Sequence, residues 1–354
     1  MVSVRVHFVT NRNLETSGGG RNFGPHFNPD GVAALRFGYV DFAEAETTFK
    51  PANVHVYPEG RLDPDSQVDP DITKTGGGKF LEALHAMMSG EAQKDALVFI
   101  HGFNVGFGEA IEAGAKLARE IRVDAVAGAS GEMLNIVVFS WPSEGQKVPY
   151  MSYYSDREDA RASGPALARA FLKLTEFLHQ LDRERYCLRS VHLMAHSMGA
   201  YVLRQGLQAL IAKQPDSLVR VFDQILLASP DEDDDTFEHD TKLKLLPRLA
   251  KRVTVYFNPK DRALWISDKT KTNPDRLGAD GARLVDLLPK KVVMVDCRRV
   301  AGVADPKVEH SYYVRSPAMS ADIARTLAGL DTDEIGNREY VPERRVWRIQ
   351  RELA

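Results

Sequence analysis

The sequence predicts an α/β fold, with a doubly wound, mostly parallel sheet and antiparallel strands at its N-terminal edge. The first observation is a series of short, unbroken apolar runs, which are typical of strands covered on both faces. The second is that helical patterns lie between these runs, which implies right-handed crossovers. The third is that residues 1–75 contain strand-like segments with no helix between them.

The N-terminal segment contains three expected strands, at residues 2–10, 35–40 and 53–57, joined by loops rich in Gly, Pro and Asn. Antiparallel pairing at one edge of the sheet is the simplest arrangement for strands with no intervening helix. Residues 58–78 carry prolines and several acids, so we expect an exposed loop there.

Strand-like and helix-like segments alternate through most of the remaining chain. Six apolar runs are expected to form parallel strands: residues 96–100, 134–139, 190–194, 221–228, 252–257 and 291–295. Helical patterns occur at residues 111–121, 167–181, 200–212 and 317–330. In the second of these, Leu167, Phe171, Leu174 and Leu178 recur at intervals of three and four residues and form one apolar stripe.

The domain organisation follows from these patterns. We expect residues 1–330 to form a single domain, with edge strands and loops in 1–75 and the core in 76–330. Residues 331–354 form a polar C-terminal extension, in which Val346, Trp347 and Ile349 are the main apolar anchors. We expect this extension to pack on the outside or to be partly disordered.

The composition is that of an ordinary soluble protein, with 44% hydrophobic and 27% charged residues among 354. A net charge of −3 favours neither nucleic acid nor an acidic membrane as a partner. The N-terminus does not resemble a signal peptide and no apolar run would span a bilayer, so we expect a cytoplasmic protein without membrane insertion. Cys187 and Cys297 show no metal-binding spacing and indicate no disulfide framework. The sequence does not indicate the oligomeric state.

The most informative motif is Ala195-His196-Ser197-Met198-Gly199, between an expected strand and an expected helix. A serine in such a sharp strand-to-helix turn is exposed above the sheet as a nucleophile. Small residues are required on both sides because strand and helix crowd together. Gly199 meets this requirement, and Ala195 departs from the G-x-S-x-G pattern by one methyl group. An ordinary helix N-cap is the alternative interpretation of Ser197.

A nucleophilic serine needs a base and an acid that orients the base. Asp261 follows the expected strand 252–257, and His310 lies in the loop between the last apolar run and the helix at 317–330. The resulting order of serine, acid and histidine is that of hydrolases with a nucleophile elbow. Taken singly, Asp261 could be a capping residue and His310 a packing residue, so their order and their positions at strand ends carry the prediction.

Asp231 is the alternative acid, because it also follows a strand, at residues 221–228. It begins the acidic run Asp231-Glu232-Asp233-Asp234-Asp235, which could hold a divalent cation, since hard cations prefer carboxylate oxygens. A solvated loop with helix-capping aspartates is the simpler interpretation, and we assign no metal.

The oxyanion donors are expected from two backbone N–H groups. The turn His101-Gly102-Phe103 follows the strand 96–100, so that the Phe103 N–H points into the site, and Met198 supplies the second N–H. His101 is interpreted as shaping this turn, His196 as part of the packing of the elbow, and His192 as structural.

Three residues are candidates for lining a substrate pocket: His101, Trp141 and Tyr153. Trp141 ends the strand 134–139 at the same edge as Ser197, and Tyr153 lies in the aromatic stretch 149–154, ahead of a helix expected to start near Glu158. Simple packing is the alternative for these aromatic residues. The later strands have no long apolar insertion of the kind that a large lipase lid needs.

Six blocks follow one another as in a known family: residues 99–104, 139–143, 194–199, 227–231, 258–264 and 310–312. On these motifs the chain resembles a bacterial family of α/β-hydrolases without assigned function, over roughly residues 95–330. The resemblance implies the α/β-hydrolase fold with Ser197 as nucleophile, Asp261 as acid and His310 as base. It does not imply a substrate, because this fold hosts many reactions.

We therefore expect a serine hydrolase that cleaves an ester or thioester of small to medium size through an acyl-enzyme, without a metal or organic cofactor. An amidase or peptidase with the same triad is an alternative, since only the leaving-group pocket would differ. A non-catalytic binding protein that retains the fold is another.

Overall fold

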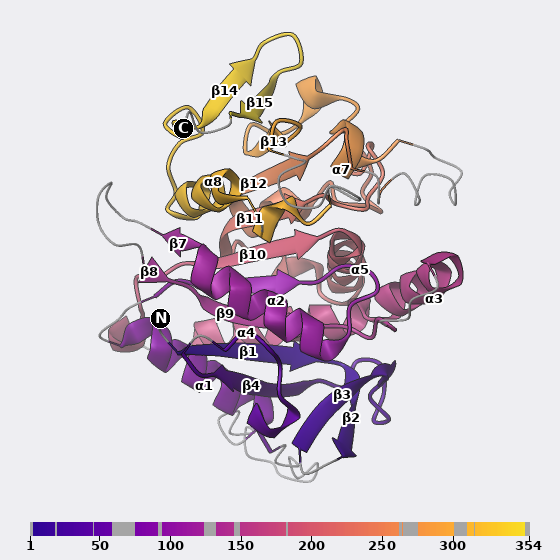
Figure 1. Cartoon of the computed structure of the whole chain (residues 1–354), viewed down its shortest axis with the longest axis vertical. Helices are drawn as coiled ribbons and strands as arrows, with labels where there is room; N and C mark the ends of the chain where they lie inside the picture. The colour runs from indigo at the N-terminus through magenta and orange to yellow at the C-terminus, as the bar shows by residue number, and fades with distance from the viewer. Residues whose placement is uncertain are drawn as a thin grey trace.

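The fold is that of a computed structural model (Figure 1), which describes residues 3–17, 20–44, 46–58, 75–90, 94–123, 132–144, 149–181, 183–261, 264, 275–300, 310–314 and 316–350. Its strands are β1 (Val4–Thr10), β2 (Arg12–Ser17), β3 (Gly20–Phe27), β4 (Arg36–Phe42), β5 (Val54–Val56), β6 (Ala96–Ile100), β7 (Arg122–Val123), β8 (Glu132–Met133), β9 (Asn135–Ser140), β10 (Val191–His196), β11 (Phe222–Ala228), β12 (Ala250–Phe257), β13 (Val292–Asp296), β14 (Arg338–Val341) and β15 (Val346–Ile349). Its α-helices are α1 (Gly76–Ser89), α2 (Phe107–Glu120), α3 (Pro149–Ala162), α4 (Gly164–Gln180), α5 (Met198–Lys213), α7 (Leu277–Asp280) and α8 (Pro317–Leu327).

A central sheet of eleven strands has the order β14-β15-β13-β12-β11-β10-β6-β9-β1-β4-β5. Every neighbouring pair from β15 to β1 is parallel, whereas β4 and β5 at one edge and β14 at the other are antiparallel to their neighbours. The predicted fold class is therefore confirmed, including the antiparallel edge. β1 joins the two parts, because it pairs with β4 in antiparallel and with β9 in parallel orientation.

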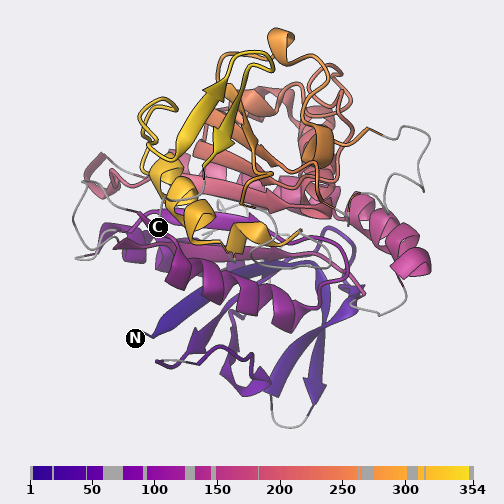
Figure 2. The ribbon, with the colours of Figure 1, turned by 45° about the horizontal axis from the view of Figure 1, so that its top comes forward.

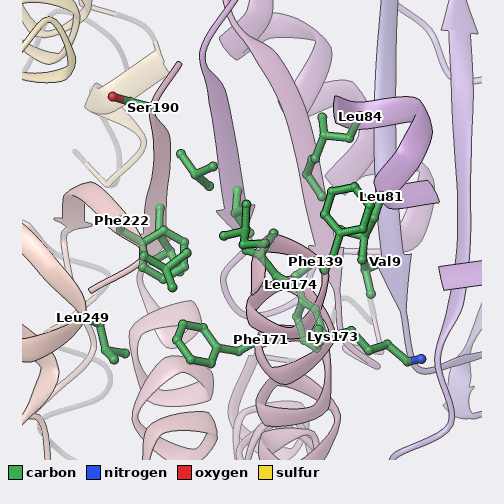
Figure 3. A pocket seen from close by; sticks show the side chains of 18 of the residues that line it. Val9, Leu81, Leu84, Phe139, Phe171, Lys173, Leu174, Ser190, Phe222 and Leu249 are labelled. Atoms are coloured by element: carbon green, nitrogen blue, oxygen red, sulfur yellow. The ribbon is translucent and has the colours of Figure 1, made fainter. Parts of the chain in front are cut away.

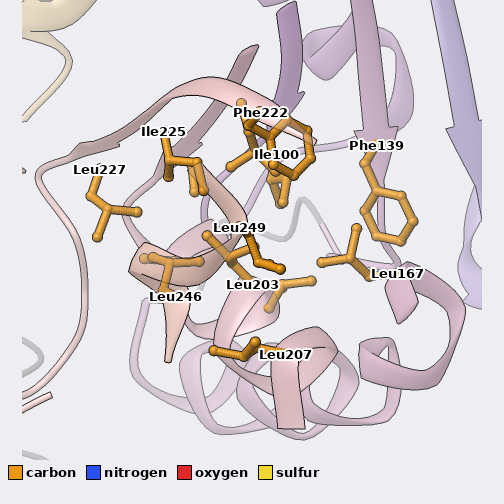
Figure 4. Close-up of a cluster of buried hydrophobic side chains, with 14 of the residues drawn as sticks. Ile100, Phe139, Leu167, Leu203, Leu207, Phe222, Ile225, Leu227, Leu246 and Leu249 are labelled. Carbon is orange, nitrogen blue, oxygen red and sulfur yellow. The ribbon is translucent and has the colours of Figure 1, made fainter. Parts of the chain in front are cut away.

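Helices cover both faces of the sheet, as a doubly wound topology requires (Figure 2). One face packs against α1, α4 and α5, and the other packs against α2 and α8. Beneath α5 the strands contribute Ile100, Ile225 and Leu227, and the helices contribute Leu167 and Leu203 (Figure 4). Each of the six apolar runs forms a strand, with bounds within two residues of those expected, because only such side chains fill both layers of the core.

Two N-terminal elements differ from the sequence expectations. The segment after β1 contains the hairpin β2–β3, which we did not expect because its residues are mostly polar; Phe23 anchors it against Phe8 and Phe107, with ring centroids 5.4 and 4.8 Å apart. Helix α1 begins at Gly76, inside the expected loop 58–78, of which residues 59–74 lie outside the described residues. The Thr75 hydroxyl caps this helix by accepting a hydrogen bond from the Gly78 N–H.

Two later segments also differ. Helix α3 starts at Pro149, so the aromatic stretch 149–154 is helical and the expected start near Glu158 is wrong; proline is well suited to a first helical turn. The polar C-terminal segment contributes β14 and β15, and β15 extends the sheet by pairing with β13. The sequence did not predict these strands because they are mostly polar. Val346 and Ile349 are their only buried apolar residues.

No helix within the described part of the chain is long and apolar enough to cross a membrane.

Candidate active site

Ser197 forms the turn between β10 and α5, with φ 52° and ψ −124°. A positive φ is unfavourable for a residue with a side chain, and it occurs at serine nucleophiles because the turn is so sharp. Two backbone hydrogen bonds hold the turn: the Ser197 N–H donates to the Ala228 carbonyl, and the Asp231 N–H donates to the Ser197 carbonyl, each at 3.0 Å. The strain is therefore fixed by the neighbouring strand β11 and the loop that follows it.

Two glycines permit the close packing around this serine. A Cβ atom on Gly199 would lie 2.4 Å from the Ile100 carbonyl oxygen and 2.7 Å from that of His101. A Cβ atom on Gly102 would lie 3.0 Å from the Cβ of Ser197. The turn after β6 therefore lies directly against the elbow. Ala195, the departure from the usual motif, is fully buried in β10.

The backbone N–H groups of Phe103 and Met198 have no hydrogen-bond acceptor among the described residues. The Met198 N–H belongs to the first turn of α5, where such groups lack an intrahelical partner and carry the positive end of the helix dipole. Both N–H groups stay candidates for oxyanion donors.

Asp261 and His310 come together at the same edge of the sheet. The His310 Nδ1 lies 2.7 Å from the Asp261 Oδ2, and the Asp261 side chain is fully buried. Asp261 follows β12 in a turn in which its N–H donates to the Asn258 carbonyl at 3.0 Å. A buried carboxylate at this distance fixes the ring and the tautomer of a histidine, which leaves Nε2 for proton transfer.

His196 connects this pair to the elbow. Its ring centroid lies 4.7 Å from that of His310 and 4.4 Å from that of Tyr313. Burial, followed by the nearby His310, lowers the pKa of His196 well below 6.5, so that this ring stays neutral. His196 thus packs next to the neighbouring Ser197 and supports His310, in agreement with the role in packing expected for it. His192 is buried in β10, with Nε2 3.4 Å from the Asp95 Oδ2.

Asp231, the alternative acid, is also buried at this edge, where its Oδ2 accepts a hydrogen bond from the Tyr153 hydroxyl at 2.7 Å. Tyr153 is one of the expected pocket residues, and it reaches Asp231 from α3. Its ring also meets Phe103 edge-on, with centroids 5.6 Å apart. Through Tyr153, helix α3 therefore contacts both the loop after β11 and the turn after β6.

Three of the other residues of the acidic run, Glu232, Asp233 and Asp235, form ion pairs. Asp233 contacts Arg276 at 2.6 Å and Lys242 at 3.0 Å, and Glu232 contacts Arg204 at 3.2 Å. No group of three or more His, Cys, Asp or Glu side chains in the described ranges is arranged to hold a metal ion. These carboxylates therefore brace the loop after β11.

His101 and Trp141, the two other expected pocket residues, are fully buried, His101 in the turn after β6 and Trp141 directly after β9. Their rings are stacked with centroids 5.2 Å apart, and the Trp141 indole N–H donates to the His101 carbonyl at 2.9 Å. Burial, with the nearby Arg12, lowers the pKa of His101 to about 3, so it is neutral at physiological pH. Both residues hold the turn in shape, and a contact with substrate stays a prediction.

Arg12 is a buried residue of this site that the sequence did not reveal. It donates hydrogen bonds to the Ser140 hydroxyl at 2.9 Å and to the carbonyls of Val105, Ser143 and Gly24 at 2.8, 3.1 and 3.2 Å. Burial lowers its pKa to about 9. Arg12 thereby joins the ends of β9 and of the oxyanion turn, and no pattern near position 12 signals this, because its partners are distant in sequence.

Asp156 is the second such residue. On α3, its carboxylate accepts hydrogen bonds from the Asn104 N–H at 3.0 Å, the Glu144 N–H at 2.9 Å and the Ser143 hydroxyl. Asn104, directly after Phe103, has a left-handed φ of 57°. Asp156 therefore fixes the strained residue next to a candidate oxyanion donor.

Comparison with known proteins identifies the family. Residues 79–328 match the family described as "Alpha/beta hydrolase of unknown function (DUF900)". A search of curated protein sequences gives no match. Among solved structures, a protein described as a cell-surface hydrolase of Lactobacillus plantarum WCFS1 is 12% identical, over 69% of this chain and 95% of that chain, with a TM-score of 0.34. That likeness is too low to support an argument, whereas the family match spans well over half of the chain. The chain therefore belongs to this family of α/β-hydrolases of unknown function, as its six sequence blocks indicate, and is by class a hydrolase.

Proposed function

We propose that the protein is a serine hydrolase that cleaves a small to medium carboxylic ester or thioester through an acyl-enzyme on Ser197. One observation carries the proposal: a strained serine at the β10–α5 turn shares a sheet edge with a histidine whose Nδ1 lies 2.7 Å from a buried aspartate. A structural N-cap would need neither the strained backbone nor the aspartate–histidine pair.

The proposed reaction follows from the roles of these groups. His310 accepts the Ser197 proton through Nε2 while the hydroxyl oxygen attacks the substrate carbonyl carbon, and Asp261 stabilises the resulting imidazolium. The N–H groups of Phe103 and Met198 donate to the oxyanion of the tetrahedral intermediate. His310 then protonates the leaving alkoxide or thiolate. Water, activated by the same histidine, releases the acyl group and regenerates the serine.

Labelling with a fluorophosphonate probe tests whether Ser197 is an activated nucleophile. We expect the folded wild-type protein to be labelled and Ser197→Ala to be unlabelled, because the phosphonate is transferred only to an activated hydroxyl. Ser89→Ala, which changes an exposed serine at the end of α1, is the matched control and should be labelled like wild type. Absence of labelling in folded wild-type protein would favour the non-catalytic binding protein.

The ester preference is tested with p-nitrophenyl esters of increasing acyl length and with the matching anilides, using Ser197→Ala as the blank. We expect turnover of the short and medium esters. A higher kcat/KM for the anilides would instead assign the protein to the amidases or peptidases, which use the same triad.

A further inference from the structure

A cavity of about 550 Å³ lies between the sheet and α4 (Figure 3). Its walls come from α1, α4, α5 and the sheet, and they are lined by apolar side chains that include Leu84, Phe139, Phe171, Leu174, Leu207 and Phe222. The volume falls within the range of about 300–1,000 Å³ that is typical of small-molecule sites.

The mouth of this cavity opens at the opposite end of the strands from the candidate active site. Ser197 lies at the carboxyl end of β10, whereas Val191, which lines the cavity, begins the same strand. Six residues of extended chain place Val191 roughly 20 Å from Ser197, whereas the inner part of the cavity extends along the sheet to Phe139, which lies level with Ala195. None of the residues assigned to the triad or the oxyanion donors lines the cavity.

The apolar lining of the cavity is only partly shielded from solvent. Phe171, Leu174 and Leu178 face the cavity from the apolar stripe of α4, yet each remains partly exposed. The cavity opens to solvent, and an apolar guest would remove these partly exposed side chains from water. The cavity therefore suits a hydrocarbon chain.

The mouth of the cavity is basic. Its exposed lining residues gather at the starts of β10, β11 and β12, and they include Tyr186, Arg220 and Lys251. Arg220 and Lys251 form no ion pair within the described part of the chain, and Asp223 is the one carboxylate among the described lining residues. Two cations without an ion pair in the described ranges, at the mouth of an apolar cavity, complement an anionic head group.

We propose that this cavity binds an amphiphile with one apolar chain and a carboxylate head, that is, a fatty acid of medium to long chain. The chain lies between the sheet and α4, and the carboxylate contacts Arg220 and Lys251 at the mouth. This binding site is independent of the proposed hydrolysis at Ser197.

Isothermal titration of the full chain with saturated carboxylates of eight to fourteen carbons, below their micellar concentrations, tests the proposal. We expect affinity to rise about tenfold for every two methylenes, because each buried methylene adds a constant free energy. Arg220→Gln and Lys251→Gln should each weaken carboxylate binding several-fold and leave the matching alcohols unaffected. Lys116→Gln, on the exposed face of α2 across the sheet, is the matched control and should bind like wild type.

Two further variants locate the ligand. Leu174→Trp places a bulky ring in the cavity and obstructs the path of the chain, so it should lower affinity more than tenfold, with circular dichroism as the check of folding. Ser197→Ala should bind the carboxylates like wild type, whether or not the protein hydrolyses esters. Loss of binding in Ser197→Ala, or affinity independent of chain length, would overturn the proposal. If Leu174→Trp does not fold, the mouth variants and Ser197→Ala decide it.

Discussion

At the scale of single residues, the candidate site depends on a strained serine held by its neighbours. A non-glycine residue in a sparsely populated backbone region costs about 1–3 kcal/mol, and it persists only where the surroundings enforce it. Here the Ala228 carbonyl and the Asp231 N–H hold Ser197 from β11 and its loop, and the missing side chain of Gly199 lets α5 approach β6. The reactive geometry is thus a property of four chain segments.

Gly199→Ala should disrupt this geometry. The new Cβ would meet two backbone carbonyl oxygens at 2.4 and 2.7 Å, and backbone atoms cannot move aside as side chains do. We expect ester hydrolysis to fall about a hundredfold or more through displacement of the Met198 donor. Gly336→Ala, at a site with open space around it, is the matched control and should keep wild-type activity. Unchanged kcat in folded Gly199→Ala would contradict the proposed elbow.

The identity of the acid is tested by two amide substitutions. Asp261→Asn should lower kcat about 10⁴-fold, because the histidine loses the carboxylate that selects its tautomer. Asp231→Asn should cost less than about tenfold, since Asp231 accepts a hydrogen bond from Tyr153 on α3. Steady-state kinetics on one p-nitrophenyl ester measures both, and the reverse ranking would assign the acid to Asp231.

Arg12 is expected to be a positioning residue. Arg12→Met leaves buried carbonyls without a donor, so we expect the free energy of unfolding to fall by about 3 kcal/mol and kcat to fall with little change in KM. Arg12→Lys should lower the free energy of unfolding and kcat less than Arg12→Met does, because lysine keeps the charge but has fewer directed donors. Arg21→Met, an exposed arginine on β3, is the control. Equal losses in kcat for the Lys and Met variants would argue against positioning by the guanidinium.

At the scale of elements, the C-terminal hairpin is attached through a buried ion pair. The Arg338 guanidinium of β14 contacts the Asp322 carboxylate of α8 at 2.6 and 2.7 Å, and both side chains are fully buried. The Tyr256 hydroxyl donates to the same carboxylate from β12 at 2.8 Å. Strand β14, helix α8 and strand β12 are therefore linked through the Asp322 carboxylate.

Arg338→Leu should lower the free energy of unfolding by about 3–5 kcal/mol, because it leaves Asp322 buried without its cation. The double variant Arg338→Leu/Asp322→Leu should be more stable than the single variant, since no uncompensated charge remains. Urea unfolding of the wild type, both single variants and the double variant gives the coupling free energy. Strict additivity of the two substitutions would refute the coupling.

The elements that the sequence predicts are those whose pattern reflects burial on both faces. The apolar runs of β6, β9 and β10 are examples, and the rule that active-site residues follow parallel strands brought Asp261 and His310 to one edge. The hairpin β2–β3 and the strands β14 and β15 are polar, and they depend on contacts with distant residues. The sequence does not predict the roles of Arg12 and Asp156 for the same reason: their partners at Val105 and Asn104 are adjacent only after folding.

At the scale of the whole molecule, the two-sided core makes stability depend on pH through buried histidines. His7 of β1 is fully buried, with Nε2 3.1 Å from the Met87 sulfur and its ring edge-on to Phe80. Burial lowers its pKa to about 4 from a usual value near 6.5. Between these two pH values the unfolded chain binds a proton at His7 that the folded protein does not.

The stabilising contribution of neutral His7 is therefore complete above pH 6.5 and is lost as pH falls toward 4. We expect His7→Gln to flatten the pH dependence of the free energy of unfolding by about 1.4 kcal/mol per pH unit between pH 4.5 and 6. Urea unfolding at several pH values measures the free energy of unfolding of both proteins. The difference between wild type and His7→Gln at pH 7.5 is the reference. Parallel curves for wild type and variant would show that His7 does not carry this effect.

The position of β1 beside β9 affects how the chain is made. Val6 pairs with Ile136, so the parallel partner of the apolar strand β1 is synthesised 130 residues after it. At a synthesis rate of about 5–20 residues per second, this delay is on the order of ten seconds. During translation β1 can meet its antiparallel neighbour β4 first, with His7 opposite Tyr39. The N-terminal edge can thus protect the nascent strand from aggregation until the ribosome delivers the centre of the sheet.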